Sequence, residues 1–475
     1  MKETRKGNLL FVGGDLSGIQ KFIYNVSSKK AAVSLKGRSE YLSLYTTELK
    51  EALCELPSVK STGYEEVYCS SGKFYLIAAD TPEVRNAIEQ FSEQQQRLLW
   101  QKQHGQLSIA ICYVPFHFIE DGKNVVVNNQ EGTIGLLWSA INPLFAAAKK
   151  HSFQHVLCDN YDAMFNPIPV GGHVKVCAIT GIESAECVEI TDKEESLLVL
   201  PAVKEQIELG EQLRNKEHFK TFEEYADKTY LGILRMDVDG LGSRFILGFK
   251  DLDEYTQFSE HLHAFFSKNI YAIQQKDTYK SHLNIIYAGG DDLFVVGRWD
   301  KVIEFAAEVR DQFVSHTKGE DLSISGGIAI VNAKFPIAKA AQMAGEAEDC
   351  AKNYISPTNK SKNAICFFGE TISWTEEYDK VLQLKNNFVY YITTHGVSKG
   401  VLHQLMQYAE MAKEGHHRYI WHSTYYLTRM LKENKNDYAK KFLQELRDKQ
   451  MPQGTANMKL IALAARWAEQ EIRIN

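Results

Sequence analysis

The sequence predicts an α+β fold with two related sheet domains, a linker region between them and a helical C-terminal domain. Three observations carry this prediction. Apolar, β-prone runs occur in pairs joined by tight turns, an Asp-containing strand-turn-helix motif occurs twice, and the stretch 376–475 is rich in helix-forming residues. At 475 residues the chain is long enough for several domains with buried cores.

The composition describes an ordinary globular protein, with 44% hydrophobic and 24% charged residues. A net charge of −6 argues against nucleic-acid binding through overall charge, so we expect RNA or DNA contacts to be shared with partners. The apolar run near the start is stopped by Gly13-Gly14-Asp15, far short of a signal peptide or a membrane span. The eight scattered cysteines are predicted to be reduced thiols, which favours a cytoplasmic location.

The first predicted domain covers residues 1–150. Its opening stretch, 12–23, is typical of a strand that ends in Asp15 and turns through Ser-Gly into a helix. A second β-prone stretch, 68–77, is interrupted by a Ser-Ser-Gly-Lys turn. The same domain is predicted to contain a strand at 106–115 and an amphipathic helix at 134–151.

The predicted linker domain covers residues 151–228 and contains two incomplete zinc-ligand pairs. A zinc ribbon carries cysteines in Cys-x-x-Cys pairs. Here Cys177 is followed by Thr180, and Cys187 is followed by Ile190. Neither replacement supplies a thiolate, so we predict a zinc-ribbon remnant that binds no zinc. A loop-rich stretch at 166–172 precedes it, and a polar, helix-prone stretch at 195–229 follows it.

The second predicted domain covers residues 229–375. An apolar strand beginning at residue 231 ends in Asp-Val-Asp-Gly, and a hairpin at 283–296 has Gly-Gly-Asp-Asp at its turn. The carboxylates at these strand ends are Asp237, Asp239, Asp291 and Asp292. Two neighbouring strands that end in carboxylates can hold one or two magnesium ions together with the triphosphate that the ions neutralise. This is the arrangement of a polymerase or cyclase palm domain.

The two domains are predicted to be diverged copies of each other. Tyr68 aligns with Tyr287, and Asp15 aligns with Asp237, at similar distances along the chain from the respective turns. The turn Ser70-Ser71-Gly72-Lys73 then falls on Gly289-Gly290-Asp291-Asp292, so that only the second copy keeps the turn carboxylates. The first copy either holds a second nucleotide through Ser17, Gln20, Ser70 and Ser71, or only buries the back of the second copy.

Further nucleotide contacts are expected downstream of the hairpin. After a helix at 300–315, the strand at 322–330 contains Ser325 and Gly326, whose small side chains would let a nucleotide approach the backbone. Lys352 and Lys362 are candidates for contacting the polyphosphate. From Pro336 onward Ala340, Met343, Ala347, Ala351 and Tyr354 recur with helical spacing, which predicts a mostly buried helix face.

The order of these motifs resembles the large polymerase/cyclase subunit of type III CRISPR effector complexes, closest to the III-A branch. The motifs are Gly-Gly-Asp-Leu-Ser-Gly-Ile-Gln, the broken zinc ribbon, Asp-Val-Asp-Gly-Leu-Gly and Tyr-Ala-Gly-Gly-Asp-Asp-Leu. The resemblance implies two ferredoxin-like palm domains related to GGDEF cyclases, and a C-terminal helical domain that packs against small subunits. It also implies antiviral activity, in which pairing of guide RNA with a target transcript triggers the conversion of ATP to cyclic oligoadenylates.

The resemblance also assigns residues. It implies that Asp237, Asp291 and Asp292 are catalytic and that, together with Asp239, they bind Mg²⁺ or Mn²⁺. Metal ions at this position would lower the pKa of a ribose 3′-hydroxyl, align it on the α-phosphate of a second ATP and stabilise the departing pyrophosphate. Gly289 and Gly290 would bring the backbone close to the nucleotide. The expected partners are the other subunits, with guide and target RNA bound mainly through the complex, and no membrane.

The sequence also bears on several alternative functions. Many family members begin with an HD nuclease domain, whereas this chain begins at the first palm and has no His-Asp dipeptide, so we do not expect DNA cleavage by it. A P-loop NTPase is excluded because no Gly-x-x-x-x-Gly-Lys-Ser/Thr occurs, and Asp292-Leu293 in place of Glu-Phe disfavours a diguanylate cyclase. Two readings stay open: a palm that makes a different adenylated product, and a scaffold subunit that binds guide RNA and small subunits without catalysis. Clustered carboxylates are unfavourable without a cation, which speaks against the scaffold.

Overall fold

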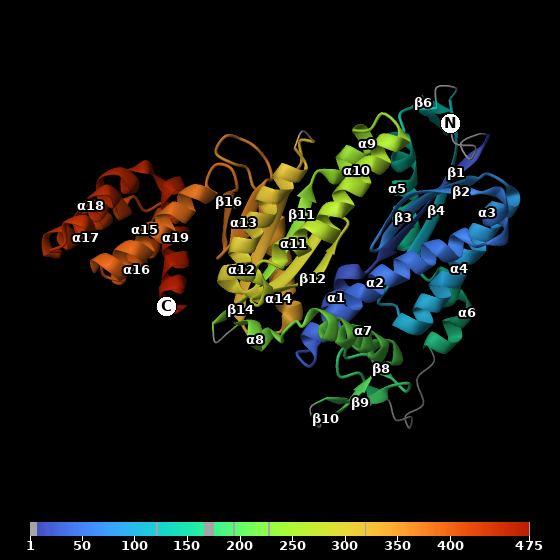
Figure 1. Cartoon of the computed structure of the whole chain (residues 1–475), viewed down its shortest axis with the longest axis horizontal. Helices are drawn as coiled ribbons and strands as arrows, with labels where there is room; N and C mark the ends of the chain where they lie inside the picture. The colour runs from blue at the N-terminus through green and yellow to red at the C-terminus, as the bar shows by residue number, and fades with distance from the viewer. Residues whose placement is uncertain are drawn as a thin grey trace.

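The structure, a computed structural model, describes residues 7–119, 122–165, 175–192, 195–226, 229–318 and 320–474. Two six-stranded sheets flanked by helices form most of the molecule, and a group of C-terminal helices extends beyond the second sheet (Figure 1). The predicted α+β class is confirmed. The predicted loop at 166–172 lies outside the described residues.

The first sheet has the strand order β2-β3-β1-β4-β5-β6. Its central strand, β1 (Leu9–Ser17), is an apolar run that is buried on both faces. Successive side chains of a strand point to opposite faces. Accordingly Leu9 and Phe11 belong to one core, and Leu10 and Val12 belong to the other. The remaining elements are β2 (Tyr64–Ser70), β3 (Lys73–Ala79), β4 (Ser108–Phe118), β5 (Val125–Val127), β6 (Gln130–Gly132), α1 (Ile19–Tyr24), α2 (Ala31–Cys54), α3 (Pro57–Thr62), α4 (Pro82–Gln103), α5 (Gly135–Lys150) and α6 (Gln154–Phe165).

The second sheet has the strand order β12-β13-β11-β14-β15-β16. Its central strand, β11 (Tyr230–Asp239), pairs antiparallel with β13 and β14. The predicted hairpin is present, with β12 (Leu283–Gly289) and β13 (Asp292–Arg298) joined by a two-residue turn. The remaining elements are β14 (Ser323–Asn332), β15 (Ala364–Phe367), β16 (Glu370–Ser373), α9 (Leu241–Leu247), α10 (Leu252–Ala264), a π-helix (Phe265–Asn269), α11 (Ile270–Gln274), α12 (Asp277–Lys280), α13 (Trp299–His316) and α14 (Ile337–Lys352).

The first four strands of each sheet follow one plan, as the internal repeat predicts. The order β2-β3-β1-β4 in the first sheet corresponds to β12-β13-β11-β14 in the second. Both hairpins have an irregular register just before the aligned tyrosines, Tyr68 and Tyr287. The turn carbonyl is also held in the same way, since the Leu16 amide donates to the Gly72 carbonyl over 2.8 Å and the Val238 amide to that of Asp291 over 3.3 Å. We call residues 7–150 the first unit and residues 229–375 the second unit.

Helix α2 connects the first unit to the linker region and to the second unit. It crosses α7 (Pro201–Glu217) so closely that a Cβ atom on Gly37 would lie 1.8 Å from the Gln206 carbonyl oxygen. On the same helix, Lys36 is 5% exposed and its Nζ donates to the Ile285 carbonyl of β12 over 2.9 Å. Buried lysines are stable only when they are paired, and Lys36 also forms an ion pair with Glu217 at 3.1 Å. The position of β12, and of the turn that follows it, is therefore tied to α2.

The linker region between the two units is built from small elements around two buried cysteines. Cys177 and Cys187 are both free thiols, and they belong to a hydrophobic core to which both units and the linker region contribute. The absence of zinc stays a prediction. The elements of this region are β7 (Lys175–Val176), β8 (Glu183–Ser184), β9 (Val188–Asp192), β10 (Glu195–Val199), α7, and α8 (Phe222–Ala226).

Helices form the C-terminal part of the chain. Among them α19 (Thr455–Ile474) packs against the edge of the second sheet, where Trp467 meets Phe367 edge-to-face and Arg466 donates to the Phe368 carbonyl over 2.7 Å. The others are α15 (Tyr378–His395), α16 (Gly400–Lys413), α17 (Arg418–Glu433), α18 (Asp437–Glu445), a π-helix (Leu446–Gln450) and a 3₁₀ turn (Met451–Gln453). The domain limits at residues 150, 228 and 375 stay predictions.

The predicted core face of α14 is confirmed at Ala340 and Ala351, which are fully buried, and is wrong at Met343, which is 37% exposed. The helix ends at Lys352, before Tyr354. The buried face also contains Ala344 and Glu348. The reason is the close approach of the helix to β14, where a Cβ atom on Gly327 would lie 2.1 Å from the Glu348 amide nitrogen. The close contact with β14 therefore buries the helix face that carries Ala344 and Glu348, and the larger Met343 side chain points toward solvent.

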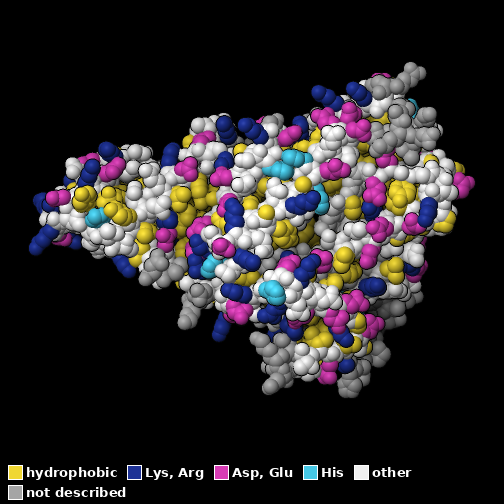
Figure 2. All heavy atoms as spheres, viewed as in Figure 1, with side chains coloured by type: hydrophobic (Ala, Val, Ile, Leu, Met, Phe, Trp, Pro, Cys, Tyr) yellow, Lys and Arg dark blue, Asp and Glu magenta, His cyan; other side chains and the backbone are white. Residues whose placement is uncertain are grey.

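Charges of both signs are interspersed over the visible face of the molecule, and no large field of one sign occurs there (Figure 2). Hydrophobic side chains gather at the end formed by the C-terminal helices (Figure 2). These helices carry the strongly exposed aromatic residues Trp421, Tyr425 and Tyr438. Among the described residues, no helix combines the length and the apolar character that crossing a bilayer requires.

Candidate metal and nucleotide site

A pocket of about 720 Å³ lies where the two units meet. It brings together eight of the predicted site residues: Ser17, Gln20, Ser70 and Ser71 from the first unit, and Gly289, Gly290, Asp291 and Asp292 from the second. The two hairpin turns face each other across it. A Cβ atom on Gly289 would lie 3.5 Å from the Ser71 hydroxyl, and one on Gly290 would lie 3.5 Å from the Ser70 hydroxyl. Glycines at this point therefore leave space between the turns.

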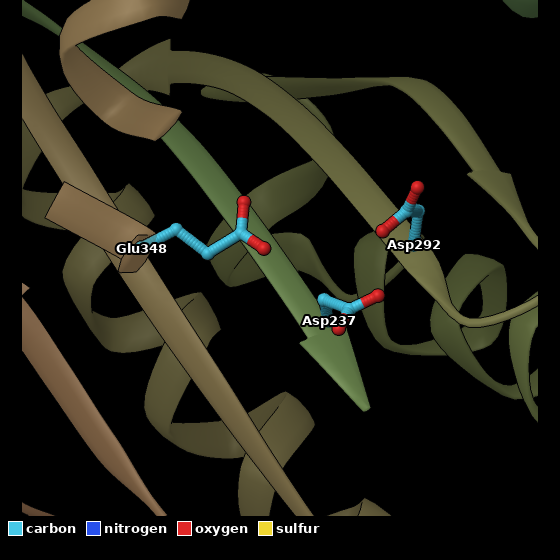
Figure 3. A group of neighbouring side chains, drawn as sticks. All are labelled: Asp237, Asp292 and Glu348. Carbon is cyan, nitrogen blue, oxygen red and sulfur yellow. The ribbon is translucent and has the colours of Figure 1, made fainter. Parts of the chain in front are cut away.

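Three carboxylates of the second unit form a cluster. Asp237 on β11 lies directly opposite Asp292 on β13, and Glu348 reaches the same place from α14. One oxygen atom from each residue lies within 4.8 Å of the others, and the three side chains converge on a common centre (Figure 3). Because the residues come from three separate elements, the fold itself fixes their spacing. Three carboxylates at this spacing are hard oxygen donors that fit a divalent cation such as Mg²⁺ or Mn²⁺.

Two cationic side chains offset part of this negative charge. Lys352 Nζ lies 2.6 Å from Asp237 Oδ2 and 2.8 Å from Glu348 Oε1. Arg235 Nε lies 3.1 Å from Glu348 Oε2. Burial lowers the pKa of Lys352, but its hydrogen bonds to Asp237 and Glu348 outweigh burial and raise the pKa overall. The predicted polyphosphate contact Lys352 is thus placed directly beside the carboxylate cluster.

Without a bound cation, the pKa values of the turn residues Asp291 and Asp292 are raised, so both carboxyl groups ionise less readily than usual. Burial raises the pKa of Asp292 to about 9, and the hydrogen bond to Asp237 and the charge of Asp291 act in the same direction. Burial also raises the pKa of Asp291 to about 6, and the charge of Asp237 adds to the effect. A bound divalent cation would compete with these protons and favour the ionised forms. The electrostatics of the cluster therefore fit a cation site.

Asp239 and Ser325 lie in the sheet and do not belong to the three-carboxylate cluster, although Ser325 on β14 is directly opposite Asp237. Asp239 Oδ2 accepts hydrogen bonds from the Ser323 hydroxyl, the Ser325 hydroxyl and the Asn363 amide, at 2.7, 2.8 and 3.1 Å. Ser325 is fully buried. Two residues along a strand advance by about 6.6 Å, which separates Asp239 from Asp237 although both share one face. Protein donors therefore take up Asp239 Oδ2, whereas Asp239 Oδ1 is buried without a hydrogen-bond partner among the described residues. Ser325 does not line the pocket.

Two further predicted contacts also lie outside the pocket. Gly326 is opposite Met236 in the sheet, and a Cβ atom on it would lie 2.9 Å from Met236 Cγ. Its small size thus serves packing within the sheet. Lys362 is half-exposed in the segment between α14 and β15, with a left-handed φ of 65°. Neither residue lines the pocket.

Sequence reasoning missed Glu348, and the signal for it was available. Ala340, Ala344, Glu348 and Lys352 follow one another at intervals of four, which places a glutamate and a lysine on the buried face of the helix. A glutamate on a buried helix face requires a partner, and that requirement marks a site. The prediction instead followed the neighbouring stripe through Met343.

The first unit carries a different cluster at the equivalent place. Asp15 lies at the end of β1, opposite Lys73 of β3, and it is 9% exposed. Its Oδ2 atom lies 2.8 Å from Lys149 Nζ and 3.4 Å from Lys73 Nζ. Both lysines line the pocket, and no sequence motif marked either of them as a site residue.

Two family sequence models match the chain. The one described as "Cas10/Cmr2, second palm domain" matches residues 230–366, and the one described as "Csm1 subunit domain B" matches residues 8–167. The first match places a palm domain on the second unit. The second match covers the whole of the first sheet.

Curated relatives cover most of the chain. A protein of Mycobacterium tuberculosis, named "CRISPR system single-strand-specific deoxyribonuclease Cas10/Csm1 (subtype III-A)", is 24% identical over 88% of this chain and 61% of its own length. Proteins of the same name from Enterococcus italicus and Streptococcus thermophilus are 26% and 24% identical, over 79% and 92% of this chain and 56% and 64% of their own lengths. The chain therefore spans less than two thirds of the length of these relatives.

Solved structures show the same fold. A Csm1-Csm4 cassette in complex with AMPPNP is 19% identical, with a TM-score of 0.65 over 98% of this chain and 70% of that one. A cassette in complex with cA4 is 18% identical, with a TM-score of 0.63 over 98% and 71%. Csm1 of T. onnurineus is 21% identical, with a TM-score of 0.62 over 98% and 70%. With these relatives and family matches, the chain is a homologue of the Cas10/Csm1 proteins of subtype III-A CRISPR systems.

Proposed function

We propose that this chain is the target-RNA-activated polymerase/cyclase subunit of a type III-A CRISPR complex and converts ATP to cyclic oligoadenylates. The observation that carries the proposal is the cluster of Asp237, Asp292 and Glu348 beside a pocket that both units line. A volume of about 720 Å³ falls within the usual range of ligand pockets, roughly 300–1,000 Å³. The solved structures of similar fold in complex with AMPPNP and cA4 support a nucleotide substrate.

Both units are proposed to be ferredoxin-like palms of the GGDEF-cyclase type. In chain order the four strands of each unit are arranged 4-1-3-2 across the sheet, with helices in the connections, which supports this assignment. The central strand and the hairpin then present their ends to the same pocket. Asp237, Asp291 and Asp292 are accordingly the proposed catalytic residues, with Glu348 added as a fourth carboxylate.

The proposed reaction joins two ATP molecules at the pocket. The 3′-oxygen of one ATP forms a bond to the α-phosphorus of the other, the bond from that phosphorus to the bridging oxygen of the β-phosphate breaks, and pyrophosphate leaves. The hydroxyl proton passes to solvent. When a divalent cation is bound, it supplies a lower pKa for the attacking hydroxyl and charge stabilisation for the phosphates.

The protein side chains have defined tasks in this proposal. Asp237, Asp292 and Glu348 hold the cation, and Asp291 projects from the turn into the same pocket. Lys352 neutralises the carboxylates and contacts the polyphosphate. Gly289 and Gly290 keep the space between the turns open, so that both nucleotides reach reacting distance.

The partners are proposed by analogy with the relatives. The neighbouring structures contain a Csm4 subunit, which makes a Csm4-like protein the first expected partner. Guide and target RNA would be bound mainly through the assembled complex, and the exposed aromatic residues of the C-terminal helices are available for small subunits. A cytoplasmic location is expected for such a complex.

The direct test is mass spectrometry of the products formed by the assembled complex with ATP, Mg²⁺ and target RNA. Cyclic oligoadenylates are expected from the wild type and not from Asp291→Ala/Asp292→Ala. The matched control is Asp311→Ala, which removes an exposed carboxylate at the surface of α13 and should leave the products unchanged. If ATP is not consumed, the alternative of a non-catalytic scaffold subunit is favoured. If a different adenylated product forms, the fold assignment stands and the product assignment changes.

A further inference from the structure

The pocket residues of the first unit lie at backbone positions equivalent to those of the second unit, but their side chains carry different charges. Asp15 and Asp237 stand at equivalent points of the two central strands, each opposite the first residue of a hairpin strand. Each aspartate also binds a lysine from the last turn of a 16-residue helix, Lys149 on α5 and Lys352 on α14. The Asp–Lys pair is therefore common to both halves.

The residues around that pair differ in a consistent way. Lys73 occupies the register position that Asp292 holds in the second unit. Four residues before the helix lysine, the second unit has Glu348 and the first unit has Phe145. Phe145 packs over Gly13, where a Cβ atom would lie 2.8 Å from the ring. Two of the three carboxylates that could hold a cation are thus replaced by an ammonium group and a phenyl ring.

The replacement reverses the charge of this half of the pocket. Lys73 and Lys149 together carry two positive charges, and Asp15, the acid of the same unit, offsets one of them. Across the pocket, Lys73 also interacts electrostatically with Asp291 of the second unit. The lysine side chains are 43% and 36% exposed, so that both ammonium groups are accessible from the pocket. A divalent cation is repelled by such a group, whereas an anion with several oxygens is attracted.

Neutral donors at the same wall complete a site for phosphate oxygens. The Ser17 hydroxyl is buried, lines the pocket and has no partner among the described residues. Gln20 and Ser71 line the same wall. An unpartnered buried hydroxyl is unfavourable unless a water molecule or a ligand satisfies it. Ammonium groups and hydroxyls are together the donors that protein sites offer to polyphosphates.

We propose that Lys73 and Lys149 bind the polyphosphate of a nucleoside triphosphate directly, without a divalent cation. The pocket then holds one metal-dependent and one metal-independent nucleotide site. This inference rests on the proposed function, because it assigns the second of the two ATP molecules to the first unit. Since the cation assists the departure of pyrophosphate, the nucleotide on the lysines is the one that keeps its triphosphate and supplies the 3′-hydroxyl.

The test is equilibrium binding of labelled ATP to the full chain, in EDTA and in Mg²⁺. The wild type should bind one ATP per chain in EDTA and a second one when Mg²⁺ is present. Lys73→Met/Lys149→Met should weaken the EDTA-resistant site at least tenfold and keep the Mg²⁺-dependent site. Asp291→Ala/Asp292→Ala should do the reverse. Lys150→Met is the matched control, because this neighbouring exposed lysine does not line the pocket.

Two further variants separate a role in binding from a role in folding. Lys73→Arg keeps the charge and should retain EDTA-resistant binding. Lys73→Asp places a second carboxylate opposite Asp15, as in the second unit, and should abolish binding in EDTA. Thermal unfolding of each variant checks that the fold persists.

The possible outcomes have distinct meanings. Binding of ATP by the wild type only in Mg²⁺ would overturn the inference and leave the proposed function standing. EDTA-resistant binding that survives in Lys73→Met/Lys149→Met would also overturn it. A wild-type chain that binds no ATP under either condition would also overturn the inference, whereas the product assay on the assembled complex decides the proposed function separately.

Discussion

The two sheet units share one plan and differ in the charge they present to the pocket. Both place an aspartate at the end of the central strand, a lysine from a flanking helix on that aspartate, and a hairpin turn beside it. The second unit adds Asp292 and Glu348, whereas the first has Lys73 and Phe145 at the equivalent positions. The comparison teaches how a handful of substitutions on a repeated scaffold would convert the proposed cation site of the second unit into the proposed anion site of the first.

The largest expected effect is a loss of nucleotidyl transfer when carboxylates of the second unit are removed. Asp237→Asn/Asp292→Asn removes two carboxylates of the cluster and should reduce nucleotidyl transfer by roughly 10³-fold, because cation-assisted charge stabilisation is worth several kcal/mol. Rates of pyrophosphate release by the assembled complex measure the loss. The variant Asp300→Asn, in an ion pair with Arg298 on the same unit, should retain nearly full activity. A comparable loss of pyrophosphate release in both variants would contradict the assignment of the carboxylate cluster as the cation site.

The next prediction concerns the residue four positions before the helix lysine, which is Glu348 in the second unit and Phe145 in the first. Glu348→Ala leaves the half-buried Arg235 without its carboxylate partner and should destabilise the second unit by about 3–5 kcal/mol. Phe145→Ala leaves a cavity over Gly13 and should destabilise the first unit by about 3–5 kcal/mol. Thermal unfolding measures both losses. Only Glu348→Ala should also weaken stabilisation by Mg²⁺, and an equal Mg²⁺ response in the two variants would argue against the assignment of Glu348.

A smaller effect is expected at the contact that joins the units. Lys36→Met keeps most of the packing but removes the hydrogen bond to the Ile285 carbonyl and the ion pair with Glu217. We expect a loss of about 1–3 kcal/mol, because the carbonyl and the carboxylate lose a charged partner in a buried place. Chemical denaturation measures this loss. Lys60→Met, which removes an exposed pair with Glu55, should change stability by less than about 0.5 kcal/mol.

The smallest effect concerns pH in the absence of metal. The pKa values of Asp291 and Asp292 are raised from 3.8 to about 6 and about 9, respectively. The folded state therefore binds more protons than the unfolded state in the pH range from 3.8 to about 9. Stability from these groups is therefore fully present below about pH 4 and is lost as the pH rises toward 9. In EDTA the unfolding midpoint of the wild type should fall by a few degrees between pH 5.5 and 8.5 relative to that of Asp292→Asn. A larger fall in the variant would contradict the assignment.

The fold followed closely from the sequence where local patterns are strong. The hairpin at Gly289 to Asp292 and the turn from β1 into α1 were predicted, because β-prone runs around turn residues leave few alternatives. The internal repeat predicted the common strand order of the two sheets. The packing of α14 was mispredicted at Met343, because the contact that rotates the helix is made by Gly327 on a distant strand.

The site was predictable only in part. Ser17, Gln20 and the turn residues line the pocket, since motifs adjacent in the repeat also meet in space. Glu348, Lys73 and Lys149 were missed because their roles depend on partners far away in the sequence, such as Arg235 and Asp15. Asp239 stays a predicted metal ligand. Hydroxyls of β14 take up its Oδ2 atom, and its Oδ1 atom is buried without a partner among the described residues.

The most direct test of the asymmetry is a Mn²⁺ binding measurement on three forms of the chain: the wild type, Asp237→Asn/Asp292→Asn and Asp15→Asn. The wild type and Asp15→Asn should bind Mn²⁺ with similar affinity, and the double variant should lose binding at least tenfold. The reason is that, within the described part of the chain, converging carboxylates occur in the second unit alone. A loss of Mn²⁺ binding in Asp15→Asn as large as that in the double variant would contradict the account, since the cation site would then belong to both units.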